Sequence, residues 1–94
     1  IALRGVPEDY DAWAAAGNPA WAWEAVLPAF RRLERDLDFG TEPYHGDAGP
    51  IAIRRYRDAE LLPQHQAFLA AAERLGYRPC ADANDPWSEG AGPH

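Results

Sequence analysis

The sequence predicts an α+β fold with three helices and one or two short strands. Apolar residues recur every three or four positions after residue 23 and again between residues 62 and 75, which is the spacing of one helical face. An alanine-rich stretch at 10–16 indicates a further helix. Residues 51–55 show the alternation typical of a strand.

The first helix is expected at residues 9–16. Alanine has the highest helix propensity, and Asp9 is placed to accept hydrogen bonds from the first backbone amides as an N-cap. Gly17 follows directly and is a typical helix stop, and Asn18-Pro19 then predicts a turn.

The second helix is expected within residues 23–36. Pro28 interrupts its pattern, because proline lacks an N–H and its ring clashes with the preceding turn. The favoured solution is a short turn at 23–27 and a helix that begins near Pro28. The apolar face consists of Trp23, Val26, Leu27, Phe30, Leu33 and Leu37, and the outer face of Arg31, Arg32, Arg35 and Asp36.

A loop and a strand are expected next. Residues 38–50 are rich in glycine and proline and predict a loop, and residues 51–55 predict a strand with Ile51 and Ile53 facing inward. A lone strand leaves its backbone groups unpaired, so partners from a larger protein are expected.

The third helix, at 61–75, has the clearest pattern. Gly76 followed by Tyr77 suits a left-handed cap with its hydrophobic contact. A tail rich in turn-forming residues follows. The expected inner face consists of Leu62, Phe68, Leu69, Ala72 and Leu75.

Length and charge limit the function. The 94 residues make at most one small domain, and a net charge of −6 without any lysine argues against nucleic acid as a partner. No apolar run reaches the roughly 20 residues of a membrane span. A single cysteine, Cys80, excludes an internal disulfide and fits a reducing compartment, so a cytoplasmic location is expected.

Four tryptophans are many for this length. Without a basic groove they do not predict a base-stacking surface. Packing in a core or between domains is the favoured interpretation. The alternative is a stand-alone acidic helical module that binds a partner protein through its tryptophans.

The histidines do not predict a metal site. His45 and Asp47 lie two residues apart, and His65 and His94 supply further possible ligands, but no spacing brings the four together. We expect His45 to be a solvated loop residue and His65 a surface residue of the third helix.

No catalytic residue is predicted either. The pairs Asp9–Asp11 and Asp82–Asp85 lack the apolar setting that acid–base work requires. Asp9 is better explained as a cap, and Asp82 and Asp85 as turn residues. Gly90-Ala91-Gly92 is rejected as a dinucleotide-binding loop because no strand precedes it.

Seven short strings carry a family resemblance. In this order and spacing they resemble the glucose-methanol-choline (GMC) family of flavin oxidoreductases, with a pattern closest to its choline dehydrogenase and alcohol dehydrogenase-like branch. The strings are Leu3-Arg4-Gly5, Asp9-Tyr10-Asp11-x-Trp13, Gly17-Asn18-x-x-Trp21-x-Trp23, Val26-Leu27-Pro28-x-Phe30-Arg31-Arg32-x-Glu34, Tyr44-His45-Gly46-Asp47-x-Gly49-Pro50-Ile51, Ala67-Phe68-Leu69-x-Ala71-Ala72-Glu73-x-Leu75-Gly76-Tyr77 and Asp82-x-Asn84-Asp85-Pro86-x-x-Glu89-Gly90-x-Gly92-Pro93.

The resemblance implies a fragment of a larger architecture with an FAD-binding part and a substrate domain. Residues 1–49 would be the flavin-lid and connecting segment, and residues 50–94 the start of the substrate-binding domain. The absence of methionine and the start at Ile1 fit an internal fragment. Ile1 and Ala2 would end the segment that contacts FAD, and the Rossmann motif and catalytic histidine would lie outside this chain.

The resemblance also implies the reaction. In the family a histidine base accepts the alcohol proton while hydride passes from the carbinol carbon to flavin N5, which gives an aldehyde or ketone. The implied partners are the rest of the parent flavoenzyme chain and a small-molecule alcohol, and the fragment alone would be inactive. Trp13, Trp21 and Phe30 would pack the lid, and residues 84–92 would lie near the substrate entrance. Pro19-Ala20 departs from the family, which has a glycine beside the tryptophan.

Overall fold

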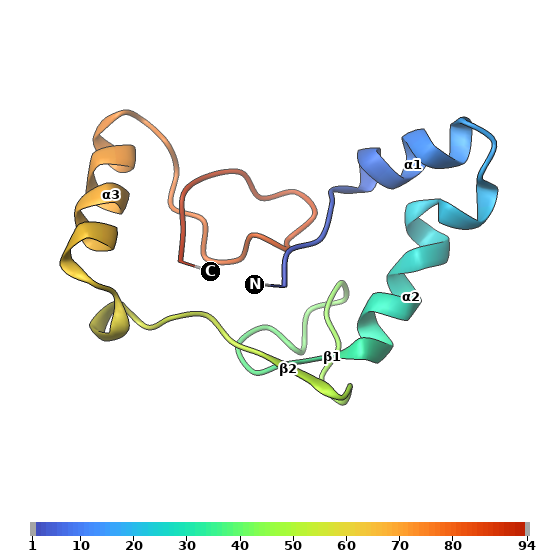
Figure 1. Cartoon of the computed structure of the whole chain (residues 1–94), viewed down its shortest axis with the longest axis horizontal. Coiled ribbons are helices and arrows are strands. Elements are labelled where there is room, and N and C mark those ends of the chain that lie inside the picture. The colour runs from blue at the N-terminus through green and yellow to red at the C-terminus, as the bar shows by residue number, and fades with distance from the viewer. Residues whose placement is uncertain (1, 94) are drawn as a thin grey trace. The chain divides into compact units, whose positions relative to one another are not determined.

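A computed structural model describes residues 2–93, which form two compact units, residues 2–54 and 55–93 (Figure 1). The predicted α+β class with three helices is confirmed, and the described residues contain two strands. The functional division predicted between residues 49 and 50 stays a prediction. The elements are α1 (Pro7–Ala15), the 3₁₀ turn η1 (Pro19–Trp21), α2 (Trp23–Leu33), β1 (Glu34–Asp36), β2 (Ile51–Ile53), the 3₁₀ turn η2 (Asp58–Glu60) and α3 (Pro63–Arg74).

Helix α1 begins two residues earlier than predicted. Pro7 takes the first helical position, where a missing N–H costs nothing. The expectation that Asp9 is the N-cap was wrong. It lies in the first turn, and its Oδ2 accepts the Val6 N–H at 3.1 Å. Gly17 stops the helix as predicted, with a φ of 102° that favours glycine.

Aromatic rings join α1 to α2. The Tyr10 ring centroid lies 5.6 Å from those of Trp13 and Trp23 and 5.7 Å from that of Phe30. Tyr10 and Trp23 are buried, whereas Trp13 is half exposed and packs edge to face on Trp21. These rings form the apolar core of the N-terminal unit.

Helix α2 is continuous through Pro28, so the predicted turn at 23–27 was wrong. An internal proline costs roughly 3 kcal/mol through the lost hydrogen bond and the ring clash. Trp23 and Phe30 lie on either side of Pro28, and in the continuous helix both rings contact Tyr10. The helix start is also capped from α1, because Asp11 Oδ1 accepts the Trp23 N–H at 3.0 Å.

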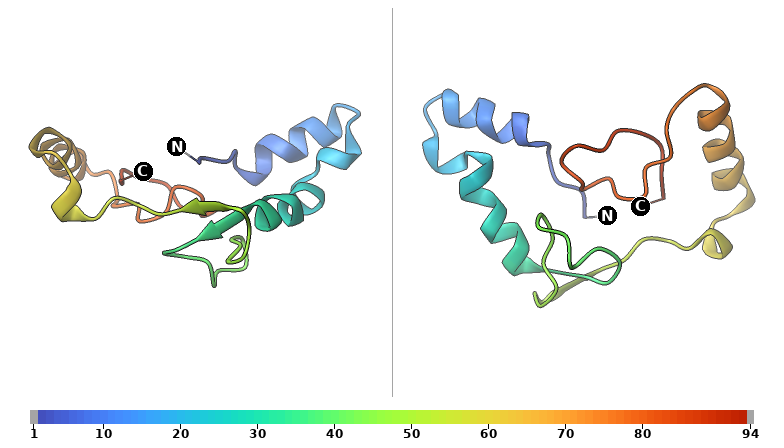
Figure 2. Two further views of the ribbon diagram at one scale, coloured as in Figure 1. Left: turned by 60° about the horizontal axis from the view of Figure 1, so that its bottom comes forward. Right: turned by 180° about the vertical axis from the view of Figure 1, so that it is seen from behind.

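Strand β1 occupies residues that were predicted to end the second helix. It pairs in parallel with β2, with Glu34 opposite Ile51 and Asp36 opposite Ile53, and the two arrows lie side by side (Figure 2). Its other edge pairs with the loop, since the Asp36 N–H donates to Gly46 O and the Gly49 N–H to Glu34 O, both at 2.8 Å. Backbone pairing therefore holds β1 on both edges.

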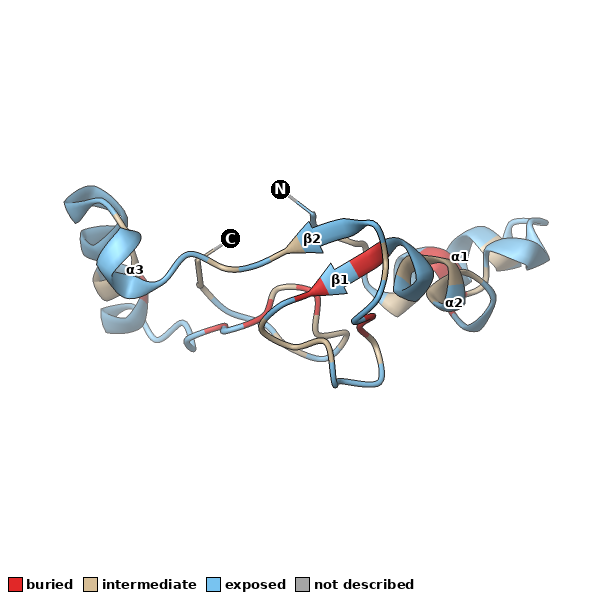
Figure 3. Cartoon of the chain, turned by 90° about the horizontal axis from the view of Figure 1, so that it is seen from below, coloured by how far each residue is buried: buried red, intermediate tan, exposed pale blue. Residues whose placement is uncertain are grey.

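The burial of β1 alternates along the strand (Figure 3). Glu34 and Asp36 are buried on one face, and Arg35 between them is exposed on the other. The inward orientation predicted for Ile51 was wrong, because 52% of its surface is exposed. The buried face of this small sheet is thus acidic, not aliphatic.

The C-terminal unit consists of α3 and a folded tail. Gly76 has a φ of 90°, which confirms the predicted left-handed cap. In the tail, Cys80 N–H donates to Ala91 O at 2.9 Å, and a Cβ on Gly92 would lie 1.6 Å from Cys80 O. Gly92 is therefore required by close backbone approach.

The predicted inner face of α3 is mostly uncovered by the described residues. Ala72 is buried, but Phe68 is 68% and Leu75 78% exposed. The predicted third helix is confirmed, whereas the expected burial of its apolar face was wrong for the described residues.

We expect the isolated 94-residue chain to unfold with low cooperativity. Its exposed apolar side chains and short strands leave little surface to bury in one transition, so helix content should persist while tertiary packing is loose. Circular dichroism during heating and binding of a hydrophobic dye measure this. A sharp transition above about 60 °C, in the upper mesophile range, would contradict the expectation.

We expect Gly46→Ala to loosen β1. The added Cβ would lie 1.9 Å from the backbone oxygen of Arg31, so the strand pairing must shift. The cost should be about 1 to 3 kcal/mol, as for other overpacked sites. Backbone hydrogen exchange at residues 34–37 of the folded protein, measured at low temperature, should become faster. The control substitution Ala48→Ser, at an exposed position of the same loop, should leave this exchange unchanged. Equal exchange in both variants would show that the close approach is not limiting.

Candidate functional site

His45 is the centre of a buried polar cluster. Only 1% of its surface is exposed, and Nδ1 lies 2.7 Å from Glu34 Oε1 and 3.3 Å from Asp36 Oδ2. The expectation of a solvated loop histidine was therefore wrong. The loop carrying His45 folds back onto β1, and the two carboxylates of the strand take up the imidazole.

Backbone donors satisfy the same carboxylates. Glu34 Oε1 also accepts the Gly46 N–H at 3.0 Å. Asp36 Oδ1 accepts the N–H groups of Asp38 at 3.0 Å and Phe39 at 2.9 Å. His45 Nδ1 lies within hydrogen-bond distance of Glu34 Oε1, and Arg4 Nη2 lies 3.5 Å from the same ring nitrogen.

Arg4 brings a positive charge into this cluster. Its side chain is 6% exposed, and Nη1 donates to Tyr44 O at 2.7 Å and lies 3.8 Å from Glu34 Oε1. The guanidinium carbon also lies 5.8 Å from the Phe30 ring centroid, within the range of a cation–π interaction. Burial of a carboxylate is costly unless opposite charge and hydrogen bonds compensate it.

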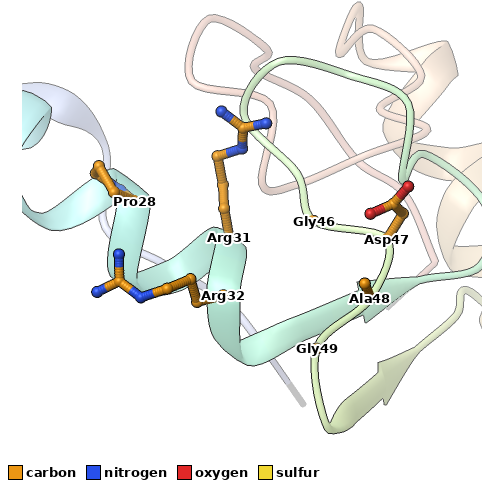
Figure 4. Close-up of a pocket in the computed structure, with 7 residues that line it drawn as sticks. All are labelled: Pro28, Arg31, Arg32, Gly46, Asp47, Ala48 and Gly49. Carbon is orange, nitrogen blue, oxygen red and sulfur yellow. The ribbon is translucent and has the colours of Figure 1, made fainter.

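An open groove adjoins the cluster, with a volume of about 460 Å³ (Figure 4). Arg31 and Arg32 project from the last turn of α2 in different directions. Arg31 Nε donates to His45 O at 3.1 Å, and the Asp47 carboxylate offsets part of the positive charge. The groove lining therefore carries two guanidinium groups and one carboxylate. Its lining residues are Pro28, Arg31, Arg32, Gly46, Asp47, Ala48 and Gly49.

The cluster has the donor set of a metal site. Ligand atoms of Glu34, Asp36 and His45 all lie within 4.8 Å of one another, and carboxylates with imidazole bind several divalent ions. However, Nδ1 already lies 2.7 Å from Glu34 Oε1 and 3.3 Å from Asp36 Oδ2, so the three side chains contact one another directly. Arg4 supplies positive charge at 3.8 Å. A closed ionic network explains the geometry without an ion.

The remaining predicted residues do not join this cluster. Ala2 and His65 are exposed. Asp82 Oδ1 accepts the Asn84 N–H at 3.0 Å, and Asp85 Oδ1 accepts the Trp87 N–H at 2.9 Å, so their roles in turns are confirmed. Asp82 also forms a partly buried ion pair with Arg55, and Ile1 and His94 lie outside the described residues.

Sequence reasoning missed the acidic face of β1. The run of apolar residues continued past the true helix end at Leu33, so Asp36 was placed on an outer helical face. The available signal was the alternation Glu34-Arg35-Asp36 together with His45-Gly46, in which glycine permits the close approach that buries the histidine.

Within residues 2–93, none of the helices has both the length and the apolar character required to cross a membrane.

Comparisons with known proteins agree on one family. The sequence model of the protein family described as GMC oxidoreductase matches residues 1–93. A 5-(hydroxymethyl)furfural oxidase of a Methylovorus species is 40% identical over 90 residues, which are 96% of this chain and 17% of that protein. An oxygen-dependent choline dehydrogenase of Photobacterium profundum is 38% identical over 93 residues, or 99% of this chain and 16% of the relative.

The solved structures give the same picture. Pyridoxine 4-oxidase from Mesorbium loti superposes with a TM-score of 0.81 at 34% identity, over 90% of this chain and 16% of that one. The chain spans about one sixth of the length of the curated relatives it matches.

We expect the Glu34–Asp36–His45 cluster to keep its structure without metal. Its charges are balanced by Arg4 and its carboxylates accept backbone hydrogen bonds. Dialysis against EDTA should leave the hydrogen exchange of residues 34–46 unchanged, and elemental analysis before dialysis should find no stoichiometric metal. Faster exchange after dialysis, reversed by one equivalent of a divalent ion, would identify a metal site.

Proposed function

The chain belongs to the GMC oxidoreductase family, and on that premise we propose that it is a segment of an FAD-dependent enzyme that oxidises an alcohol to an aldehyde or ketone. The match over residues 1–93 carries the proposal. The length of the relatives supports the view that cofactor and catalytic groups come from other parts of a parent polypeptide.

Within this proposal residues 1–49 form the flavin-lid and connecting segment, and residues 50–94 begin the substrate-binding domain. Ile1 and Ala2 are the proposed FAD contacts. Ala2 and Leu3 are exposed, small or apolar, and uncharged, which fits a segment that lies against a planar apolar ring system. Arg4 is not proposed as an FAD contact, because its side chain contacts Tyr44 and Glu34.

The reaction separates into what the cofactor supplies and what this chain supplies. Bound FAD would provide the acceptor for the hydride that leaves the carbinol carbon. The residues of this chain would position and shield. The aromatic core around Tyr10 packs α1 against α2, and the Glu34–His45 contact holds the loop against β1. The segment that contains Ala2 is therefore attached to an ordered part of the chain.

Chemistry by His45 is not part of the proposal. A general base must reach the proton that it takes from the substrate. His45 is 1% exposed and its Nδ1 faces two carboxylates, so we assign it a structural role and place the catalytic histidine outside this chain.

Exposed apolar residues support the same proposal. Phe68, Tyr77 and Trp87 leave most of their surface open in the C-terminal unit, as expected of residues that pack against other parts of a parent enzyme. The same exposure would suit the alternative of a stand-alone interaction module. A cytoplasmic location and the absence of a nucleic-acid partner stay predictions from the sequence.

We expect the full-length polypeptide encoded around this chain to bind FAD and to reduce it with a primary alcohol. Bleaching of the flavin absorbance under anaerobic conditions measures the half-reaction. The isolated 94-residue chain should show neither binding nor turnover with the same panel of alcohols, because the groups proposed to hold FAD and to take the proton lie elsewhere.

Two results would contradict this proposal. A start codon directly before Ile1 and a stop codon after His94 would restore the stand-alone module. Alcohol turnover by the isolated chain would show that its own residues complete an active site.

A further inference from the structure

We propose that Arg4, Glu34 and His45 form an ionic clamp that positions the flavin-contacting end of this chain. The proposal rests on the proposed function for the identity of the cofactor, but the clamp itself is described entirely within residues 2–54. Arg4 is therefore inferred to be a positioning residue, acting through the backbone of residues 2–5.

The first step in the argument is the reach of Arg4. It is separated from Tyr44 by 40 residues and from Glu34 by 30, yet it donates to the carbonyl of the first and approaches the carboxylate of the second. The segment before α1 has no helical or strand hydrogen bonds of its own. The contacts of Arg4 attach this segment to β1 and the loop, while the Gly5 N–H, which donates to Tyr10 Oη at 3.3 Å, attaches it to α1.

The second step is the rigidity of the acceptor side. Glu34 Oε1 is held by His45 Nδ1 at 2.7 Å and by the Gly46 N–H at 3.0 Å. The His45 carbonyl is in turn held by Arg31 Nε at 3.1 Å, which ties the loop to α2. The guanidinium of Arg4 thus meets a carboxylate whose position is fixed by three elements.

The third step is electrostatic. Glu34 and Asp36 lie two residues apart on the same buried face of β1, so their charges repel unless cations stand beside them. Arg4 brings its guanidinium to 3.8 Å from Glu34. Removal of the Arg4 guanidinium would leave the buried Glu34 carboxylate with less compensating charge, and it would release residues 2 and 3 from β1 and the loop.

The fourth step connects the clamp to the cofactor. One residue separates Ala2 from Arg4, and an extended chain spans at most about 3.6 Å per residue. Ala2 therefore cannot move far from its place while Arg4 is clamped. A backbone held in this way meets its ligand without first being ordered, which reduces the entropic cost of binding.

The test uses the full-length polypeptide with Arg4→Gln, Arg4→Lys and Glu34→Gln. Arg35→Lys and Glu24→Gln are matched controls at exposed positions of β1 and α2. The first readout is hydrogen exchange of residues 2–6 in the FAD-free protein. We expect Arg4→Gln and Glu34→Gln to accelerate it about tenfold or more, because each leaves a buried charge without one of its partners.

The second readout is the dissociation constant of FAD, measured by quenching of flavin fluorescence. Arg4→Gln should weaken binding about tenfold, Arg4→Lys should restore part of the loss by keeping the charge, and the controls should match the wild type. If Glu34→Gln does not fold, the Arg4 pair still decides the outcome.

The outcomes separate the clamp from the proposed function. Accelerated exchange with unchanged FAD affinity, or unchanged exchange in Arg4→Gln, would overturn the clamp as a positioning device. A wild type that binds no FAD would overturn the proposed function, and exchange at residues 2–6 would then still show whether Arg4 and Glu34 hold this segment.

Discussion

The N-terminal half of this chain depends on how two buried carboxylates on one face of a three-residue strand are neutralised. Strand β1 places Glu34 and Asp36 on the same side, where an aliphatic pair would be expected. Burial of acidic groups is costly unless hydrogen bonds and opposite charge compensate it. His45, Arg4 and the backbone N–H groups of residues 38, 39 and 46 provide that compensation.

Much of the local architecture follows from this requirement. To bring His45 to Glu34, the loop after β1 must fold back against the strand, and it does so through backbone pairing at Gly46 and Gly49. The same loop then leads into β2, which pairs with the opposite edge of β1. The aromatic core around Tyr10 is a separate source of stability, and it sets the direction in which α2 delivers the chain into β1.

The sequence predicted the helices well and the polar cluster badly, for different physical reasons. Helix faces and glycine stops are local patterns, so Gly17 and Gly76 were placed correctly and all three helices were found. The helix through Pro28 required tertiary packing to outweigh a local penalty, which no local pattern reveals. The burial of His45 arises from pairing between segments 11 residues apart, and Arg4 joins from 41 residues away. The Glu34-Arg35-Asp36 alternation was present but read as the end of a helix.

The central claim is that the ion pair between Arg4 and Glu34 stabilises the fold, so that the effect of removing one side chain depends on the presence of the other. A double-mutant cycle with Arg4→Gln, Glu34→Gln and the double variant, read as the free energy of local opening from hydrogen exchange at residues 34–36 in the full-length polypeptide, measures that coupling directly. The account predicts a coupling of about 1 to 3 kcal/mol, as for contacting groups in one network. Strictly additive effects of the two substitutions would contradict it.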